Sequence, residues 1–140
     1  MVKAITPQEA FEETPYVAVY GTLKRGFWNN HLLADSEFVG EGYTVGKYEL
    51  FDVGFPYAVP SKKGLPLKVE VYRVPSPEVF EALDFLEGYP EHYLKRVERI
   101  RLKDGRKVYA WIYYTLNPQG EKVEVTSFDE DLGIEYLQWP

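Results

Sequence analysis

Apolar residues along this chain gather in short runs, which is typical of strands. Residues 16–20 form an almost unbroken apolar run, which predicts a central strand buried on both faces. Residues 38–52 are rich in β-branched and aromatic types but are interrupted by glycines, so we expect bent or bulged strands there. Residues 67–74 alternate between apolar and polar types, and this alternation predicts a strand with one face in water.

Residues 76–88 follow a helical pattern instead. Ser76 followed by Pro77 is an N-cap and first-turn signal, and Gly88 is the expected stop. The apolar positions recur at the spacing of one helix face: Val79, Phe80, Leu83 and Leu86. We expect these side chains to form the buried stripe of a helix that runs to about Leu86.

Two final strands are predicted near residues 93–102 and 107–115, where they flank the hairpin signal Asp104-Gly105. Prolines exclude residues 55–60 from a central strand, because proline has no amide donor.

Two shorter signals predict helical turns. Asn29 or Asn30 can cap a short helix through residues 31–34. The segment Ser127-Phe128-Asp129-Glu130 fits a capping box for one further turn.

Length and composition indicate one ordered domain over residues 1–140, with residues 1–15 as a polar lead-in and 120–140 as a C-terminal extension. The chain has 140 residues, of which 45% are hydrophobic and 16% aromatic, which is far richer than a disordered segment. No apolar run approaches the roughly 18 residues of a membrane span, and the acidic first fifteen residues do not resemble a signal peptide. We therefore expect a soluble, cytoplasmic protein without a membrane partner.

Charge and residue types exclude several classes of function. A net charge of −6 and a pI near 5.0 argue against nucleic-acid binding, which needs a basic face. The absence of cysteine excludes disulfides, thiolate metal sites and cysteine nucleophiles. None of the four serines lies between glycines, as in a hydrolase elbow. The two histidines, His31 and His92, are 61 positions apart, so we expect no metal site. Carboxylate chemistry remains, and the sequence carries no signal for an oligomeric state.

Glu87 lies at the end of the predicted helix and is a candidate general acid/base. The partial negative charge of a helix C-terminus, together with Asp84 one turn back and Glu91 nearby, disfavours another negative charge. We therefore expect the pKa of Glu87 to be raised toward neutrality, where a carboxyl group can accept and return a proton. Local sequence leaves an alternative open, an ordinary solvated charge at a helix end.

The glycine-containing loop at residues 21–26 follows directly after a buried strand. Such a loop can point several backbone amides into one concavity, which suits a carboxylate or an oxyanion. Tyr20 and Tyr93 are candidates to line the same pocket. A plain tight turn is the alternative for this loop.

Taken together, several motifs resemble those of the γ-glutamyl cyclotransferase-like family, including the γ-glutamylamine cyclotransferases. In chain order they are Val19–Gly26, Asn30–Leu33, Leu83–Gly88 and then Tyr93. Residues 70–74 and 110–113 support the resemblance, which spans roughly residues 16–114.

This resemblance implies a mixed α+β fold, a small β-barrel of about six or seven strands with short helices packed outside. It places the acid/base on Glu87 and the substrate loop on Tyr20, Gly21, Thr22 and Leu23, beside Tyr93. The implied reaction is a transferase or lyase reaction on a small γ-glutamyl substrate, in which the α-amine attacks the γ-carbonyl, 5-oxoproline forms and an amine departs. It requires no cofactor and no metal.

Departures from the family pattern keep a second class of function open. Lys95-Arg96 stands where the family shows one arginine after Tyr93, and Val69 stands where glycine is common, which would narrow the pocket. The alternative is a non-catalytic module that binds a small ligand on the same fold. Glu70 is the second candidate base, although a cross-strand ion pair suits it better. A third option, a purely structural domain, predicts no pocket and a solvent-facing Glu87.

Overall fold

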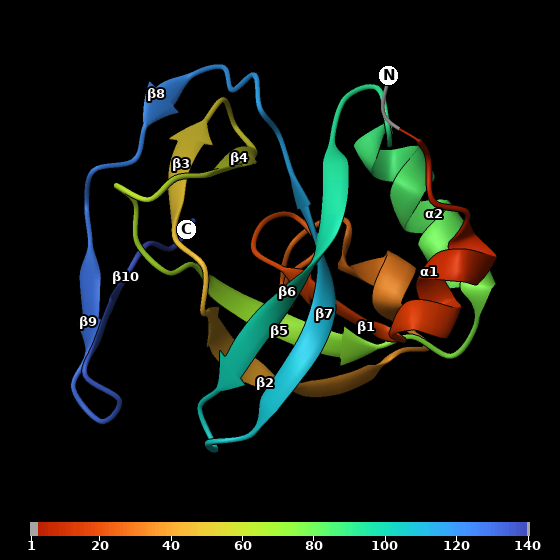
Figure 1. The fold of residues 1–140 in the computed structure, drawn as a ribbon, viewed down its shortest axis with the longest axis horizontal. Coiled ribbons are helices and arrows are strands. Elements are labelled where there is room, and N and C mark those ends of the chain that lie inside the picture. Colours follow the sequence, from red (N-terminus) through yellow and green to blue (C-terminus); the bar gives the residue numbers. More distant parts are fainter. Residues whose placement is uncertain (1–2, 140) are drawn as a thin grey trace.

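Five strands close into a barrel (Figure 1): β1 (Tyr16–Val19), β2 (Glu37–Thr44), β5 (Lys68–Arg73), β6 (Leu94–Leu102) and β7 (Lys107–Tyr114). The computed structural model describes residues 3–139 of the chain. The strand order is β1-β5-β2-β6-β7, and β1 meets β7 in parallel at Val17 and Trp111. The hairpin predicted at Asp104-Gly105 joins β6 to β7 and is confirmed. The mixed α+β barrel fold is therefore confirmed as well.

Both faces of β1 and β5 are buried. Apolar side chains from alternating strand positions fill the barrel: Ala18, Tyr20, Val69, Val71, Ile100, Leu102, Ala110 and Ile112. On the outer face, Val17, Val19 and Trp111 pack with residues of two helices. β1 is thus buried on both faces, as predicted. The predicted wet face of β5 is wrong, because Glu70 and Tyr72 are also buried.

The N-terminal segment contains a helix, α1 (Pro7–Glu13), where the sequence predicted only a lead-in. The Thr6 hydroxyl accepts a hydrogen bond from the amide of Glu9, and the Glu9 carboxyl accepts one from the amide of Thr6. This reciprocal capping box satisfies amides that a first helical turn leaves free. No helix within residues 3–139 is long and apolar enough to cross a membrane.

The second helix, α2 (Pro77–Glu87), lies beside α1 on the outside of the barrel (Figure 1). It ends at Gly88, which adopts a left-handed conformation with φ 63°, as the sequence predicted. Phe80 and Leu83 are buried under the helix, but Leu86 is 38% exposed. The predicted buried stripe is therefore wrong at Leu86, because the last turn of α2 reaches a cavity instead of the core.

The remaining strands form two small sheets. β3 (Tyr48–Asp52), β4 (Pro56–Pro60) and β8 (Glu121–Lys122) pair in the order β4-β3-β8, with the proline-flanked β4 at an edge. β9 (Ser127–Asp129) pairs with β10 (Ile134–Tyr136), so the helical turn predicted at residues 127–130 is wrong. The barrel has five strands, fewer than the six or seven expected, because these segments pair outside it.

Candidate active site

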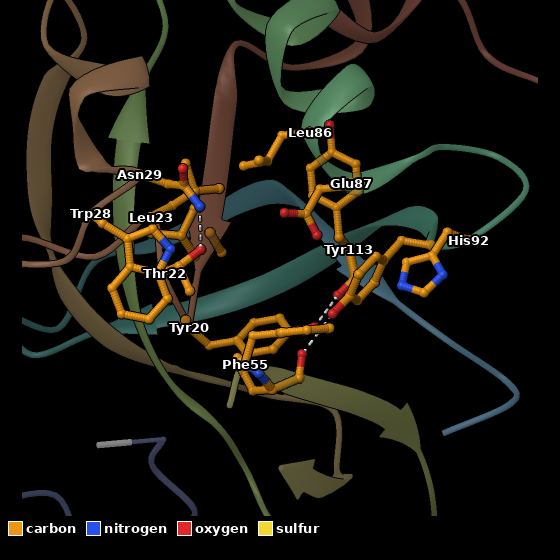
Figure 2. A pocket seen from close by; sticks show the side chains of 15 residues that line it. Tyr20, Thr22, Leu23, Trp28, Asn29, Phe55, Leu86, Glu87, His92 and Tyr113 are labelled. Atoms are coloured by element: carbon orange, nitrogen blue, oxygen red, sulfur yellow. Dashed lines mark hydrogen bonds between the residues drawn. The ribbon is translucent and has the colours of Figure 1, made fainter. Parts of the chain in front are cut away.

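A cavity of about 230 Å³ lies between the loop that follows β1 and the C-terminal end of α2. All six residues that the sequence predicted for the site line it: Tyr20, Gly21, Thr22, Leu23, Glu87 and Tyr93. Figure 2 shows Thr22 and Asn29 on one side of the cavity and the Glu87 carboxyl group directed toward them from the other. The structure thus brings together a carboxyl group and a loop that are more than sixty positions apart.

The Glu87 carboxyl group has a perturbed pKa. Burial raises its pKa from 4.5 to about 7, because a carboxylate loses hydration in such a site. Within residues 3–139 no hydrogen bond or ion pair compensates this loss. The pKa of Glu87 is raised, in the direction that the sequence predicted. The predicted cause, the negative charge of the helix end with Asp84 and Glu91, was wrong, because burial raises the pKa. Asp84 is bound by the Lys95 ammonium at 2.9 Å and by the Tyr113 hydroxyl at 2.5 Å, so its charge is already balanced.

The pair of Asp84 and Lys95 fixes the last turn of α2 to the barrel. The Lys95 side chain projects from β6 and is completely buried. Its ammonium lies 4.5–6.0 Å from the centres of four aromatic rings: Phe80, Tyr89, Trp111 and Tyr113. Such rings stabilise a cation through their faces. Neither Lys95 nor Arg96 lines the cavity, so the departure from the family pattern lies outside it.

The loop on the opposite wall is held close to β4. A Cβ atom on Gly21 would lie 2.6 Å from Cγ of Pro56, so only glycine fits there without a shift. Among the described residues, the amides of Gly21, Thr22 and Leu23 donate to no acceptor. Three successive free amides beside a cavity can bind an anion.

Two asparagines hold this loop in place through hydrogen bonds. Asn29 Nδ2 donates to the Thr22 hydroxyl at 2.9 Å, and Asn30 Nδ2 donates to the Leu23 carbonyl at 2.8 Å. The predicted short helix is a 3-10 helix, Asn30–Leu33. The predicted side-chain cap is wrong, because both amide groups serve the loop instead.

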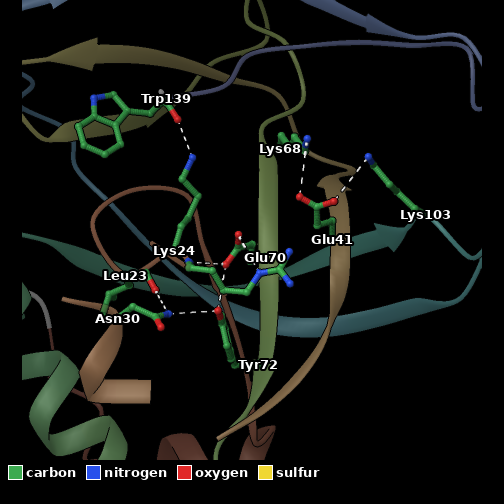
Figure 3. Close-up of polar contacts among 10 residues, drawn as sticks. Leu23, Lys24, Asn30, Glu41, Lys68, Glu70, Tyr72, Lys103 and Trp139 are labelled. Carbon is green, nitrogen blue, oxygen red and sulfur yellow. Dashed lines mark hydrogen bonds and ion pairs between the residues drawn. The ribbon is translucent and has the colours of Figure 1, made fainter. Parts of the chain in front are cut away.

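Glu70, the second candidate base, does not line the cavity, and Figure 3 shows its polar contacts. Its carboxyl group accepts hydrogen bonds from the Arg25 amide and the Tyr72 hydroxyl, each at 2.9 Å. The Arg25 side chain lies 3.7 Å away, so the ion partner of Glu70 comes from the loop and not from the neighbouring strand. Val69 is fully buried in the barrel and does not line the cavity, so the expected narrowing by Val69 is wrong.

The two predicted tyrosines form walls of the cavity. The Tyr20 hydroxyl donates to the Tyr113 carbonyl at 2.6 Å, and the Tyr93 hydroxyl donates to the Pro56 carbonyl at 2.7 Å. Burial raises the pKa of both phenols above the usual range, so both stay neutral and hold the backbone around the cavity.

Sequence reasoning missed part of the lining. Trp28, Asn29, Phe55, Leu86 and His92 all contribute to the cavity. His92 was considered only as a metal ligand, yet its Nε2 atom lies 3.1 Å from the Tyr57 hydroxyl beside the cavity. The sequence offered one indication that His92 lies near the site, because His92 follows Glu87 and Gly88 by only a few positions.

Comparisons with known proteins agree with this architecture. Residues 17–136 match the family described as "Gamma-glutamyl cyclotransferase, AIG2-like". A Methanocaldococcus jannaschii protein named as a candidate γ-glutamylcyclotransferase is 35% identical over 119 residues, which cover 84% of this chain and 98% of that protein. A similarly named Pyrococcus horikoshii protein is 35% identical over 122 residues, covering 85% and 95%. The crystal structure of a mouse AIG2-like protein superposes with a TM-score of 0.67 and 27% identity, covering 75% of this chain and 79% of that one.

Proposed function

The chain belongs to the γ-glutamyl cyclotransferase, AIG2-like family, and we propose that it releases 5-oxoproline and a free amine from a γ-glutamyl amide. The observation that carries this proposal is the pairing of Glu87, whose pKa is about 7, with the free amides of residues 21–23 across one cavity. A carboxyl group with a pKa near neutrality is suited to move a proton, and amides are suited to hold negative charge.

The reaction proceeds within one substrate molecule. The neutral α-amine of the γ-glutamyl group attacks the γ-carbonyl carbon and gives up a proton to the Glu87 carboxylate. A five-membered ring closes, and the carbonyl oxygen carries the developing negative charge. Glu87 then returns the proton to the amide nitrogen, the carbon–nitrogen bond breaks, and its electron pair leaves with the amine.

Each part of the cavity supplies a definable share of the catalysis. An intramolecular attack held in the right geometry reaches effective molarities of about 10⁵–10⁸ M, so positioning supplies much of the rate. The amides of Gly21, Thr22 and Leu23 hold the α-carboxylate or the oxyanion. One such donor is worth roughly 10²–10³ in rate where the oxyanion is its target.

No observation favours the non-catalytic module. The departure at Lys95-Arg96, which motivated it, lies away from the cavity. The purely structural alternative predicted no pocket, and the cavity that contains Glu87 contradicts that prediction.

Assay of 5-oxoproline tests the proposal. Wild type and Glu87→Gln are incubated with γ-glutamyl-ε-lysine, γ-glutamyl dipeptides, glutathione and γ-glutamylphenethylamide, whose leaving amine carries no carboxylate. Wild type forms 5-oxoproline from at least one of them, and Glu87→Gln loses at least about 10²-fold in kcat, because the amide cannot move the proton. Glu91→Gln is the matched control, since Glu91 is exposed and lies outside the cavity. Equal activity in wild type and Glu87→Gln would remove Glu87 from the mechanism.

A further inference from the structure

Three large apolar side chains that line the cavity are exposed to solvent. The exposed fractions are 63% for Trp28, 39% for Phe55 and 38% for Leu86. They come from three segments, the loop after β1, the turn between β3 and β4, and the last turn of α2. We call these three residues the apolar rim. Exposed apolar side chains around a cavity are typical of a ligand-binding surface.

The aromatic rings of the apolar rim are held in place despite their exposure. The Trp28 ring lies 6.1 Å from the Phe27 ring and 6.4 Å, edge to face, from the Trp139 ring. The Phe55 ring packs in a T-shape on Tyr57 at 5.4 Å. Because both rings are braced by further rings, a ligand that binds them loses little entropy in ordering the site.

The basic residues close to the site in sequence are all directed elsewhere. Lys24 and Arg25 directly follow residues 20–23. The Lys24 ammonium contacts the Trp139 carbonyl (Figure 3), and the Arg25 side chain contacts Glu70. Lys95 and Arg96 also lie outside the cavity. Among residues 3–139, no lysine or arginine lines the cavity.

His92 is the remaining lining residue that can carry a positive charge. Its Nε2 atom contacts the Tyr57 hydroxyl at 3.1 Å. Figure 2 shows His92 beyond Glu87, on the side away from Trp28. His92 therefore lies away from Trp28, although it packs on the same Tyr57 ring as Phe55.

The position of the apolar rim indicates which half of the substrate it contacts. This step rests on the proposed function, in which the amides of residues 21–23 and Glu87 hold the glutamyl half. The leaving amine then extends toward the exposed mouth of the cavity. We infer that the apolar rim selects γ-glutamyl amides whose leaving amine carries an apolar or aromatic group and no carboxylate. A carboxylate beside Trp28 would lose water against apolar side chains and find no lysine or arginine among the described lining residues.

Three matched substrates test this inference. γ-Glutamylphenethylamide and γ-glutamylphenylalanine differ only by a carboxylate next to the leaving nitrogen, while γ-glutamylethylamide lacks the ring. We expect kcat/KM for the phenethylamide to exceed that for each of the other two by about tenfold or more. Equal or better turnover of γ-glutamylphenylalanine overturns the inference, and so does equal turnover of the ethylamide.

Variants of the apolar rim locate the effect. Trp28→Ala lowers the phenethylamide-to-ethylamide ratio of kcat/KM by about tenfold. Trp28→Lys places a cation at the rim and shifts the preference toward γ-glutamylphenylalanine. Phe128→Ala is the matched control, because Phe128 is 60% exposed but lies outside the cavity, and it keeps the wild-type ratios. Unchanged ratios in both Trp28 variants contradict a role for the rim.

A binding experiment separates this inference from the proposed function. Affinities of the three amides for Glu87→Gln, measured by calorimetry, follow the same order without any turnover. If wild type forms no 5-oxoproline but the affinity order holds, the proposed function fails and the inference about the rim stands. If 5-oxoproline forms but the order is reversed or flat, only the inference fails.

Discussion

We expect the protonation of Glu87 to set the pH dependence of the proposed activity. Its pKa is raised to about 7 by burial, and the proposed attack on the γ-carbonyl needs the carboxylate form. We expect kcat/KM to fall by at least about tenfold per pH unit below pH 7, because the carboxylate fraction of Glu87 falls by that factor and the neutral fraction of the substrate's α-amine falls as well. Rates over pH 5–8, together with ¹³C NMR titration of the Glu87 carboxyl group, measure this. A titration midpoint near 4.5, the ordinary value, would contradict the prediction.

The same group makes the stability of the folded chain depend on pH. The pKa of Glu87 is higher in the folded state than in the unfolded state, so the folded state binds the proton more tightly. Its contribution is present in full below about pH 4.5 and is lost as pH rises through about 7. The difference between the two pKa values corresponds to roughly 3 kcal/mol at about 1.4 kcal/mol per unit.

Glu87→Gln tests this linkage, because glutamine has nearly the same shape but does not ionise. We expect the variant to be more stable than wild type at pH 8, by up to roughly 3 kcal/mol, and close to wild type at pH 5. Urea unfolding of both proteins at the two pH values measures the free energies. If the two proteins differ in unfolding free energy by the same amount at pH 5 and pH 8, burial does not disfavour the charged form of Glu87.

The contact between β4 and the loop at residues 20–23 allows a prediction at the scale of elements. Gly21→Ala places a methyl group 2.6 Å from Cγ of Pro56, so the loop or β4 has to move. We expect overpacking to cost about 1–3 kcal/mol in unfolding free energy and to lower kcat through displacement of the free amides. Pro56→Ala removes the clashing atoms, so the double variant recovers part of both losses. Losses that simply add would show that Pro56 is not the cause.

The Asp84–Lys95 pair allows a second prediction about elements. Lys95→Met keeps the length of the side chain but leaves the Asp84 carboxyl group without its cation. Loss of one partner of a buried ion pair costs about 3–5 kcal/mol, and we expect chemical denaturation to show a loss of this size. Asp84→Asn combined with Lys95→Met recovers much of it, because neither charge then remains. A single variant as stable as wild type would show that the pair does not hold α2.

Two segments with the same local pattern show why elements were predicted only in part. Residues 6–9 and 127–130 both have the order of a capping box. The first begins α1, which was missed, and the second forms β9, which was predicted as a helical turn. Residues 127–129 pair with residues 134–136 as antiparallel strands. Local helix propensity is weak, so this strand pairing decides the structure of the segment. By contrast, α2 was predicted because its apolar spacing, Pro77 and Gly88 agree.

The candidate site was predictable to the extent that it depends on motifs. Glu87 and the loop at residues 20–23 carry recognisable patterns, and both line the cavity. Trp28 and Phe55 carry none, since each is a lone aromatic residue in a loop. Trp28 and Phe55 line the cavity because closure of the barrel brings their two loops to the same end of the molecule. The local sequence around each residue does not indicate which loops meet there.

At the scale of the whole molecule, the C-terminal segment joins parts of the chain that are far apart. The Lys24 ammonium donates to the Trp139 carbonyl at 2.6 Å, and the Trp139 indole donates to Asp52 at 3.1 Å. The Trp139 ring also packs 5.2 Å from Phe27. The loop after β1, the end of β3 and the end of the chain therefore meet around one buried tryptophan.

This arrangement predicts that Trp139 stabilises the substrate loop without contacting substrate. Trp139→Ala removes the indole, so we expect a loss of about 3–5 kcal/mol in unfolding free energy. Because Phe27 and Trp28 lose their supporting ring, amide hydrogen exchange accelerates over residues 21–30, while exchange in β6 and β7 follows only the change in global stability. Phe128→Ala, in the same C-terminal segment but exposed, leaves the exchange of the loop unchanged. If Trp139→Ala loses stability but the loop exchanges no faster than β6 and β7, Trp139 supports the barrel as a whole and does not order the loop specifically.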